Sequence, residues 1–218
     1  MLFIVDKLFL ILAFLIAVIT HEFGHGWTAE KLGDPTAREA GRVTFNPMAH
    51  IDPIGTVITP ALLLIMNFPI LFGWAKPVPV NFYNLNNSKK NMACVSLAGP
   101  AVNFLTATCA AVLLRLGGIL PSEILGLNNS IVITNPFILF LVYLILINLF
   151  LGIFNLIPVP PLDGSQILEA FLPRETAWRY KKIAPYGIII IFMLFYFTAL
   201  ADFILAIVGF IISLYSIH

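Results

Sequence analysis

The chain has 218 residues, of which 60% are hydrophobic and 11% are charged, and its formal net charge is +1. Soluble globular domains carry about 25% charged residues, so this chain has too few charges to cover a surface that faces water. The composition excludes a water-soluble enzyme and a disordered segment, and the near-neutral charge excludes a nucleic-acid partner held by its phosphates. We therefore predict one membrane-embedded domain, spanning residues 1–218, that is surrounded by a lipid bilayer.

The apolar residues gather in runs long enough to cross a membrane. About 20 apolar residues cross the hydrocarbon core as a helix, and none of these runs has the alternation of a membrane β-barrel. We expect the last apolar stretch, about 183–217, to break near Ala201–Asp202 into two short spans, because one continuous helix would exceed the bilayer thickness. In chain order, the first four runs are residues 5–32, 53–75, 91–116 and 131–157. The pattern predicts an all-α, multi-pass membrane protein with about five to six transmembrane helices.

The run 53–75 has two interpretations. It is long enough to cross the membrane, but prolines and a glycine interrupt it, and proline breaks a helix. A full crossing divides the twelve basic residues into eight and four, whereas a re-entrant segment leaves only Lys7 and Arg115 opposite the other ten. Because basic residues accumulate on the cytoplasmic side, we favour the re-entrant form. The runs 5–32 and 131–157 are then parallel, and both end towards the cytoplasm.

The sequence HEFGH, at His21–His25, lies late in the first apolar run. Residues i and i+4 of a helix point the same way one turn apart, so His21 and His25 can share one metal ion. Glu22 is turned by about 100° from His21, and its carboxylate can take a proton from a water molecule beside the metal. Three ionisable residues inside a transmembrane helix are costly without a partner, and a metal ion supplies one. The motif predicts a catalytic zinc site.

A catalytic zinc site usually has three protein ligands, so a third is needed. Asp163 is the best candidate, because it ends a 39-residue uncharged stretch and follows a proline-rich segment whose irregular backbone must line a cavity or be buried. If the runs 5–32 and 131–157 are parallel, Asp163 and the histidines lie at matching depth. His50 is the competing candidate, but it lies in a proline-rich loop, where a histidine is more often simply hydrogen-bonded.

Three motifs together resemble the site-2 protease family of intramembrane zinc metalloproteases, which is peptidase family M50. HEFGH is similar to the family's H-E-x-x-H on a transmembrane helix, SLAGPAVNF at Ser96–Phe104 is similar to A-G-P-x-x-N, and NLIPVPPLDG at Asn155–Gly164 is similar to N-x-x-P-x-x-x-L-D-G. The resemblance covers about residues 5–172, which it marks as the catalytic core, followed by C-terminal helices over about 183–217.

The resemblance implies roles for individual residues. His21, His25 and Asp163 would bind one Zn2+ per chain, and Glu22 would be the general base and proton shuttle. Asn155 would lie near the scissile carbonyl, and Asn103 would support the core by hydrogen bonding. The implied reaction is hydrolysis of a peptide bond in a transmembrane protein or peptide, within or near the bilayer. The implied location is the cell membrane, with the active site towards the cytoplasmic side.

Two features depart from the wider family. The chain resembles the family's minimal branch, because neither a PDZ nor a CBS module accompanies the core. The family also places irregular or β elements between its first catalytic helix and the A-G-P helix. We expect residues 42–47 and 76–82 to supply such strands if the element between these helices is a short β structure rather than only a re-entrant segment.

Two other functions are compatible with part of the pattern. A membrane metal-ion transporter also carries intramembrane histidine and acidic residues, but transport needs polar sites across the whole membrane and these cluster at one depth. A non-catalytic membrane scaffold does not require Glu22, which is present. We therefore favour the zinc metalloprotease over both alternatives.

Overall fold

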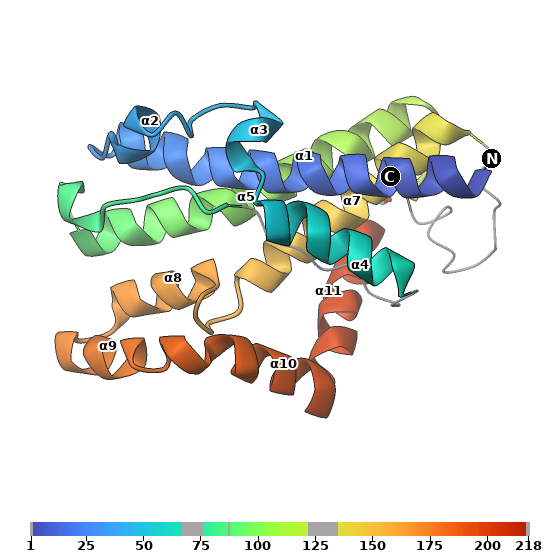
Figure 1. The fold of residues 1–218 in the computed structure, drawn as a ribbon. Helices are drawn as coiled ribbons and strands as arrows, with labels where there is room; N and C mark the ends of the chain where they lie inside the picture. Colours follow the sequence, from blue (N-terminus) through green and yellow to red (C-terminus); the bar gives the residue numbers. More distant parts are fainter. Residues whose placement is uncertain (1, 67–75, 87, 122–134, 217–218) are drawn as a thin grey trace.

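The computed structural model describes residues 2–66, 76–86, 88–121 and 135–216, and in this part of the chain all regular structure is helical (Figure 1). Three long helices form the centre of the molecule: α1 (Leu2–Lys31), α5 (Ser88–Leu116) and α7 (Pro136–Asn155). They match the predicted runs 5–32, 91–116 and 131–157, although the first residues of the last run lie outside the described part. An all-α fold is therefore confirmed for the described residues.

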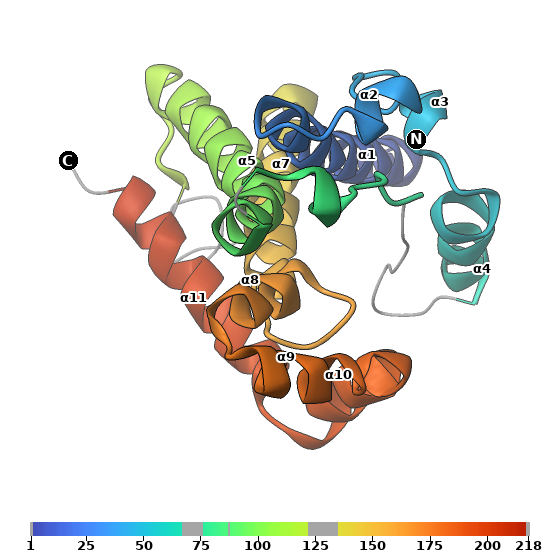
Figure 2. The same ribbon diagram turned by 90° about the vertical axis from the view of Figure 1, so that its left-hand side faces the viewer.

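The three long helices pack against one another, with α1 and α7 running in the same direction and α5 in the opposite one (Figures 1 and 2). Small residues of α5 allow the close approach, and branched apolar residues of α7 and α11 fill the space between them. This core includes Ala107, Ala110, Ala111, Leu141, Ile145, Leu149, Ile204 and Val208. The parallel arrangement of α1 and α7 brings the end of α7 beside the later turns of α1.

Between α1 and α5 the chain forms short elements: α2 (Thr36–Glu39), α3 (Pro47–His50), the π-helix η1 (Pro53–Ile58) and α4 (Thr59–Ile65). After residues 67–75, which lie outside the described part, an extended segment at 76–81 leads into the 3-10 helix η2 (Phe82–Asn84). The backbone N–H of Lys76 donates to the carbonyl of His50 over 3.0 Å. The two ends of the segment between His50 and Lys76 therefore lie next to each other.

The expected strands at 42–47 and 76–82 are wrong for the described residues, which form no ladder there. Residues 42–46 form no regular structure apart from a bend at 43–44, and Pro47 already begins α3. Residues 76–81 are extended (Figure 1) but pair with no strand. The physical reason is a shortage of donors, since Pro77 and Pro79 have no N–H. The N–H groups of Lys76 and Val78 are already bonded to His50 and Glu22, so they cannot join a sheet.

The C-terminal part begins with α8 (Asp163–Phe171) and α9 (Arg174–Lys181), and the 3-10 helix η3 (Ala184–Tyr186) leads into α10 (Gly187–Phe197) and α11 (Leu200–Tyr215). The predicted break occurs, but at Thr198–Ala199 rather than at Ala201–Asp202. Thr198 is extended and its hydroxyl receives the N–H of Leu200, which starts α11. Helix α11 packs on α5 and α7 (Figure 2), whereas α10 reaches α7 through Phe195, whose ring meets that of Phe154 edge to face at a centroid distance of 5.7 Å.

Four helical segments are long and apolar enough to cross a membrane: Lys7–Lys31, Lys89–Leu116, Pro136–Asn155 and Arg174–Phe197. Leu200–Tyr215 is a shorter apolar helix. Few side chains of Arg174–Phe197 are buried within the protein, only 6% of its most apolar stretch, against a third or more in the other three segments. An apolar helix with so little protein contact requires another apolar environment, which a bilayer provides.

Candidate metal centre

Two histidines of α1 form the first part of the candidate metal centre. His21 and His25 are four residues apart on the helix, both are buried, and their Nε2 atoms lie 3.0 Å from each other. Their rings meet edge to face, with centroids 4.7 Å apart. This is the arrangement expected for residues i and i+4 on one helical face.

Asp163, the first residue of α8, closes the group. Its Oδ2 lies 3.1 Å from the Nε2 of His21 and 3.3 Å from the Nε2 of His25. This oxygen is buried and forms no hydrogen bond among the described residues. Four tetrahedral ligands at about 2.0 Å from a zinc ion lie about 3.3 Å apart, so the three atoms have the spacing that one such ion requires. The donor set and the unpaired buried oxygen both fit zinc.

The other ring nitrogens orient the two histidines. The Nδ1 of His25 lies 2.8 Å from the carbonyl oxygen of Val95, and the Nδ1 of His21 lies 2.5 Å from Oδ1 of Asn103. A carbonyl oxygen only accepts hydrogen bonds, so Nδ1 of His25 carries the proton and donates. Its Nε2 then keeps a lone pair that points at the centre, as a metal ligand requires.

Gly99 of α5 faces the same point. A Cβ at this position would lie 2.7 Å from Nε2 of His21 and closer still to Nε2 of His25. Gly24 of α1 makes room for the opposite helix, because a Cβ there would lie 3.0 Å from the carbonyl oxygen of Ala98. Only glycine at 99 allows the helix backbone to lie against both imidazoles. The A-G-P sequence thus forms one wall of the centre.

Glu22 lies beside the histidines and receives a hydrogen bond from outside its helix. The backbone N–H of Val78, in the extended segment 76–81, donates to Oε2 of Glu22 over 2.8 Å. Arg42 donates through Nη2 to the carbonyl of Pro77 over 3.3 Å. The segment is thus held on both sides, and it fixes one oxygen of the Glu22 carboxylate.

Asp34 anchors the far end of the same segment. It is fully buried and accepts hydrogen bonds from the N–H of Asn81 at 2.7 Å and from the amide of Asn84 at 2.8 Å. Both the hydroxyl and the backbone N–H of Thr36 donate to it as well. Burial alone would raise the pKa of Asp34, but these donors outweigh burial, so the pKa lies below its ordinary value. Asp34 is therefore a charged junction between the turn after α1 and the extended segment.

The remaining predicted residues lie in different surroundings. Asn155 donates through Nδ2 to the carbonyl of Leu151 on its own helix over 3.0 Å, and no contact found among the described residues joins it to the histidines. His50 is buried, its Nε2 lies 2.8 Å from the carbonyl oxygen of Thr44, and it does not belong to the group that could hold a metal. Asp163 rather than His50 therefore completes the three-residue group.

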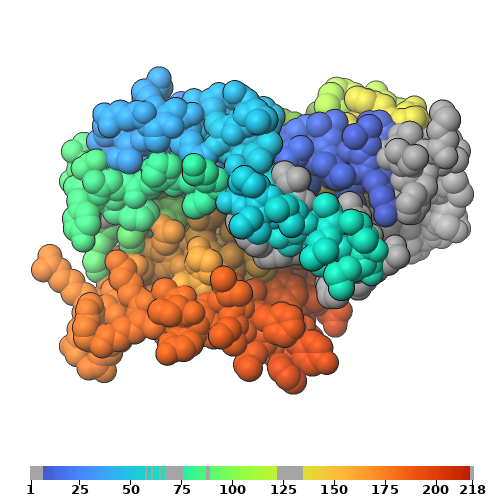
Figure 3. Space-filling view, in the orientation of Figure 1, coloured from blue at the N-terminus to red at the C-terminus, as the bar shows by residue number. Residues whose placement is uncertain are grey.

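A hollow of about 560 Å3 opens between the segment at 80–83 and the helices α8 and α9, on the face shown in Figure 3. Its lining mixes apolar residues with charged ones, including Met92, Lys89, Glu169 and Arg174. Met92 lies seven residues before Gly99 on α5, and Glu169 lies six residues after Asp163 on α8. At 1.5 Å per residue, the hollow begins about 10 Å from the metal centre.

The comparisons with known proteins agree with this geometry. The family model described as "Peptidase family M50" matches residues 9–200. A protein of Bacillus subtilis named as a zinc metalloprotease, YwhC, is 34% identical over 197 residues, which are 90% of this chain and 84% of YwhC. Two proteins named as the zinc metalloprotease Rip2 are also similar, each at 29% identity. The match to Rip2 of Mycolicibacterium smegmatis covers 87% of this chain and 67% of Rip2. The match to Rip2 of Mycobacterium tuberculosis covers 85% of this chain and 65% of Rip2. No solved structure matches the chain at a comparable level.

Proposed function

The chain belongs to peptidase family M50 and is a zinc metalloprotease, and from this premise we propose that His21, His25 and Asp163 hold the zinc ion while Glu22 acts as the general base. The observation that carries this assignment is the buried Oδ2 of Asp163. It lies within 3.3 Å of both Nε2 atoms and has no hydrogen-bond partner among the described residues. A buried carboxylate oxygen without a partner is costly, and a cation removes that cost.

A zinc ion at this position supplies Lewis acidity and makes water a competent nucleophile near neutral pH. Glu22, one residue after His21, takes a proton from the attacking water and passes it to the leaving amine. The N–H of Val78 occupies Oε2 of Glu22, which leaves the other carboxylate oxygen for this proton transfer. Asn155 is the last residue of α7, and its amide would hold the scissile carbonyl after rotating away from Leu151.

The substrate is a protein met in a membrane context, and we propose that it is a transmembrane segment. The carbonyls of a transmembrane helix are bonded within the helix, so the substrate must unwind locally before cleavage. The segment 76–81 offers few free N–H groups, because two of its residues are prolines. An added substrate strand would therefore have little to pair with there. We propose instead that the hollow beside α8 and α9 admits water and the unwound chain.

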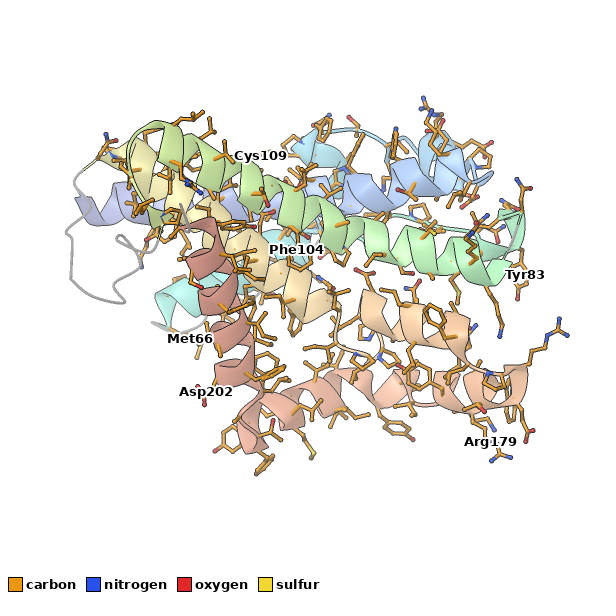
Figure 4. All side chains as sticks on the ribbon, turned by 180° about the vertical axis from the view of Figure 1, so that it is seen from behind. Met66, Tyr83, Phe104, Cys109, Arg179 and Asp202 are labelled. Atoms are coloured by element: carbon orange, nitrogen blue, oxygen red, sulfur yellow. The ribbon has the colours of Figure 1, made fainter. Side chains whose placement is uncertain are left out.

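We also propose that the segment 53–75 is re-entrant and that the centre lies towards the cytoplasmic side. The hydrogen bond between Lys76 and His50 supports this topology, because a full crossing would separate the two ends by about 30 Å. Tyr83 and Arg179 lie towards the same end of the molecule (Figure 4). The chain then places ten of its twelve basic residues on the cytoplasmic side.

Cysteine labelling tests this topology. Cys94 and Cys109 are free, and both are first replaced by serine. Thr36→Cys, before the segment, and Tyr83→Cys, after it, are then exposed to a membrane-impermeant maleimide in vesicles of known orientation. The re-entrant topology predicts labelling of both from the cytoplasmic side. Labelling from opposite sides would mean that residues 53–75 cross the membrane.

The catalytic assignment is tested with two isosteric amide substitutions. Glu22→Gln should retain zinc and lose cleavage of a co-expressed single-pass protein, because it removes the base but no ligand. Asp163→Asn should bind zinc more weakly. Glu39→Gln and Asp202→Asn, at exposed positions, are the matched controls and should behave as the wild type. Full cleavage by Glu22→Gln would refute the assigned base. Neither transport nor a scaffold role is favoured, since the family and the named relatives are proteases.

A further inference from the structure

Asn148 is a fully buried polar residue in the middle of α7, seven residues before Asn155. Its Oδ1 accepts a hydrogen bond from Nδ2 of Asn103 over 2.8 Å, and its own Nδ2 donates to the carbonyl of Leu144 over 2.8 Å. Asn103, also fully buried, donates through the same Nδ2 to the carbonyl of Ala17 over 3.1 Å. A chain of hydrogen bonds thus runs from the backbone of α7 to His21.

In this hydrogen-bond network, the two backbone carbonyls determine which atom donates in every hydrogen bond. The carbonyls of Leu144 and Ala17 can only accept, so the amide nitrogens of Asn148 and Asn103 must face them. The Oδ1 of Asn103 is then turned to His21. An amide oxygen also only accepts, so Nδ1 of His21 must carry the proton. The lone pair of His21 Nε2 is therefore directed at Asp163 and the metal centre.

Without these constraints, Asn103 has a second orientation. Its amide could rotate by half a turn and present Nδ2 to His21, which would favour the tautomer with the proton on Nε2. That tautomer has no lone pair on Nε2, the nitrogen that faces the metal centre. The rotated form is disfavoured here because Oδ1 of Asn103 would then face two acceptors, the carbonyl of Ala17 and Oδ1 of Asn148. Asn148 therefore provides one of the two acceptors that disfavour the rotated form of Asn103.

We propose that Asn148 is a positioning residue of the metal centre: it fixes the orientation of Asn103, and Asn103 holds His21 in the tautomer that binds zinc. The proposal rests on the function proposed above. It extends the centre to a third helix, because His21 lies on α1, Asn103 on α5 and Asn148 on α7. Asn148 touches neither substrate nor metal and acts only through Asn103.

The first test measures zinc affinity by competition with a chelator in the purified full-length chain. Asn148→Leu removes the acceptor but keeps the branched shape of the side chain, and we expect about a 10-fold weaker affinity, the lower end of the range for residues behind a metal ligand. Ile145→Val, one turn earlier in the same buried core, controls for a small loss of packing and should leave the affinity unchanged. The visible spectrum of the cobalt-substituted protein should change with Asn148→Leu and not with Ile145→Val.

The second test combines Asn148→Leu with Asn103→Asp. A carboxylate is symmetric and accepts through both oxygens, so Asn103→Asp has no orientation for Asn148 to fix. We therefore expect Asn148→Leu to cause no further loss of affinity in this background. An equal loss in both backgrounds would show that Asn148 acts by packing alone and would overturn the proposal. If Asn148→Leu does not fold, Asn148→Ala is compared with Leu149→Ala in its place.

The outcomes separate the two proposals. A wild-type chain that binds no zinc would refute the metal centre itself. A wild type that binds zinc, together with an Asn148→Leu variant that binds it equally well, would leave the proposed function standing and remove Asn148 from the centre.

Discussion

Glu22 and Val78 are joined by a hydrogen bond of 2.8 Å, although 56 residues separate them in the chain. The donor is the backbone N–H of Val78, and the residues on both sides of it, Pro77 and Pro79, have no N–H. The sequence KPVPV thus offers a single amide proton between Lys76 and Val80, and this proton is directed at the candidate general base. The segment acts as a support for Glu22 rather than as a sheet edge.

Val78→Pro tests this relationship, because it deletes the amide proton while the extended backbone suits proline. A hydrogen bond to a charged group is worth about 1.5–3 kcal/mol, so we expect turnover to fall by about 10- to 100-fold. Zinc content should not change, since none of the contacts described joins Val78 to His21, His25 or Asp163. Cleavage rate and bound zinc are measured on the same preparation.

Val78→Ala is the matched control for that substitution. It shortens the same side chain but keeps the N–H, and it should cleave at nearly the wild-type rate. Equal losses in the alanine and proline variants would assign the effect to the valine side chain and contradict the role of the amide.

Gly99→Ala is expected to disrupt the metal centre. The added Cβ would lie 2.7 Å from Nε2 of His21, well inside ordinary contact, so the helices or the imidazoles must shift. We expect zinc binding to fall below detection while the far-ultraviolet circular dichroism stays helical. Gly209→Ala, on α11, is the control, because a Cβ there meets nothing within 4 Å. Retention of zinc by Gly99→Ala would show that the two helices can separate at this point without loss.

The grouping of His21, His25 and Asp163 could be predicted from the sequence because the patterns that mark these residues are local. The spacing of His21 and His25 is a property of any helix, and Asp163 is conspicuous as the residue that ends a long uncharged stretch. The parallel order of α1 and α7 was also predictable, since the distribution of basic residues favours it. Placing a charged or ionisable side chain in lipid costs free energy in any membrane protein. The positions of such residues along the sequence therefore indicate both the candidate site and the order of the helices.

The supporting residues could not be predicted in the same way. Asn148 occurs in an apolar helix with no recognisable spacing to Asn103, and their contact depends on how α5 packs against α7. Val78 acts through its backbone, which no residue type reveals. The expected strands failed for a related reason: the segment 76–81 is extended as predicted, but tertiary contacts had already used its few donors.

Asp34→Asn should lower stability in a pH-dependent manner. Asp34 is fully buried, and its pKa in the folded protein is below the ordinary value of 3.8 because several donors stabilise the carboxylate. The stabilisation is therefore complete above about pH 4 and is lost as the pH falls through the lower folded value. We expect the wild type to exceed Asp34→Asn by about 1–3 kcal/mol near neutral pH, and the difference to shrink below pH 4. Thermal unfolding in detergent across this range measures it; a constant difference would contradict the charged junction.

Asn155 gives the sharpest contrast between a structural and a chemical role. Its amide donates to Leu151 one turn earlier on α7, and a bond of this kind within one helix contributes little to stability. If this hydrogen bond to Leu151 were the only role of Asn155, Asn155→Ala would leave cleavage unchanged.

The proposed function predicts otherwise. The amide must then hold the developing charge on the scissile carbonyl, and loss of one such donor costs about 100- to 1,000-fold in kcat. Zinc content should be unaffected, because Asn155 has no described contact with His21, His25 or Asp163. The measurement is kcat and zinc content on one preparation, with Asn155→Asp beside Asn155→Ala. The aspartate keeps the size of the side chain but repels a developing oxyanion, so it should be at least as inactive as the alanine. An active Asn155→Asp would place this side chain outside the reaction.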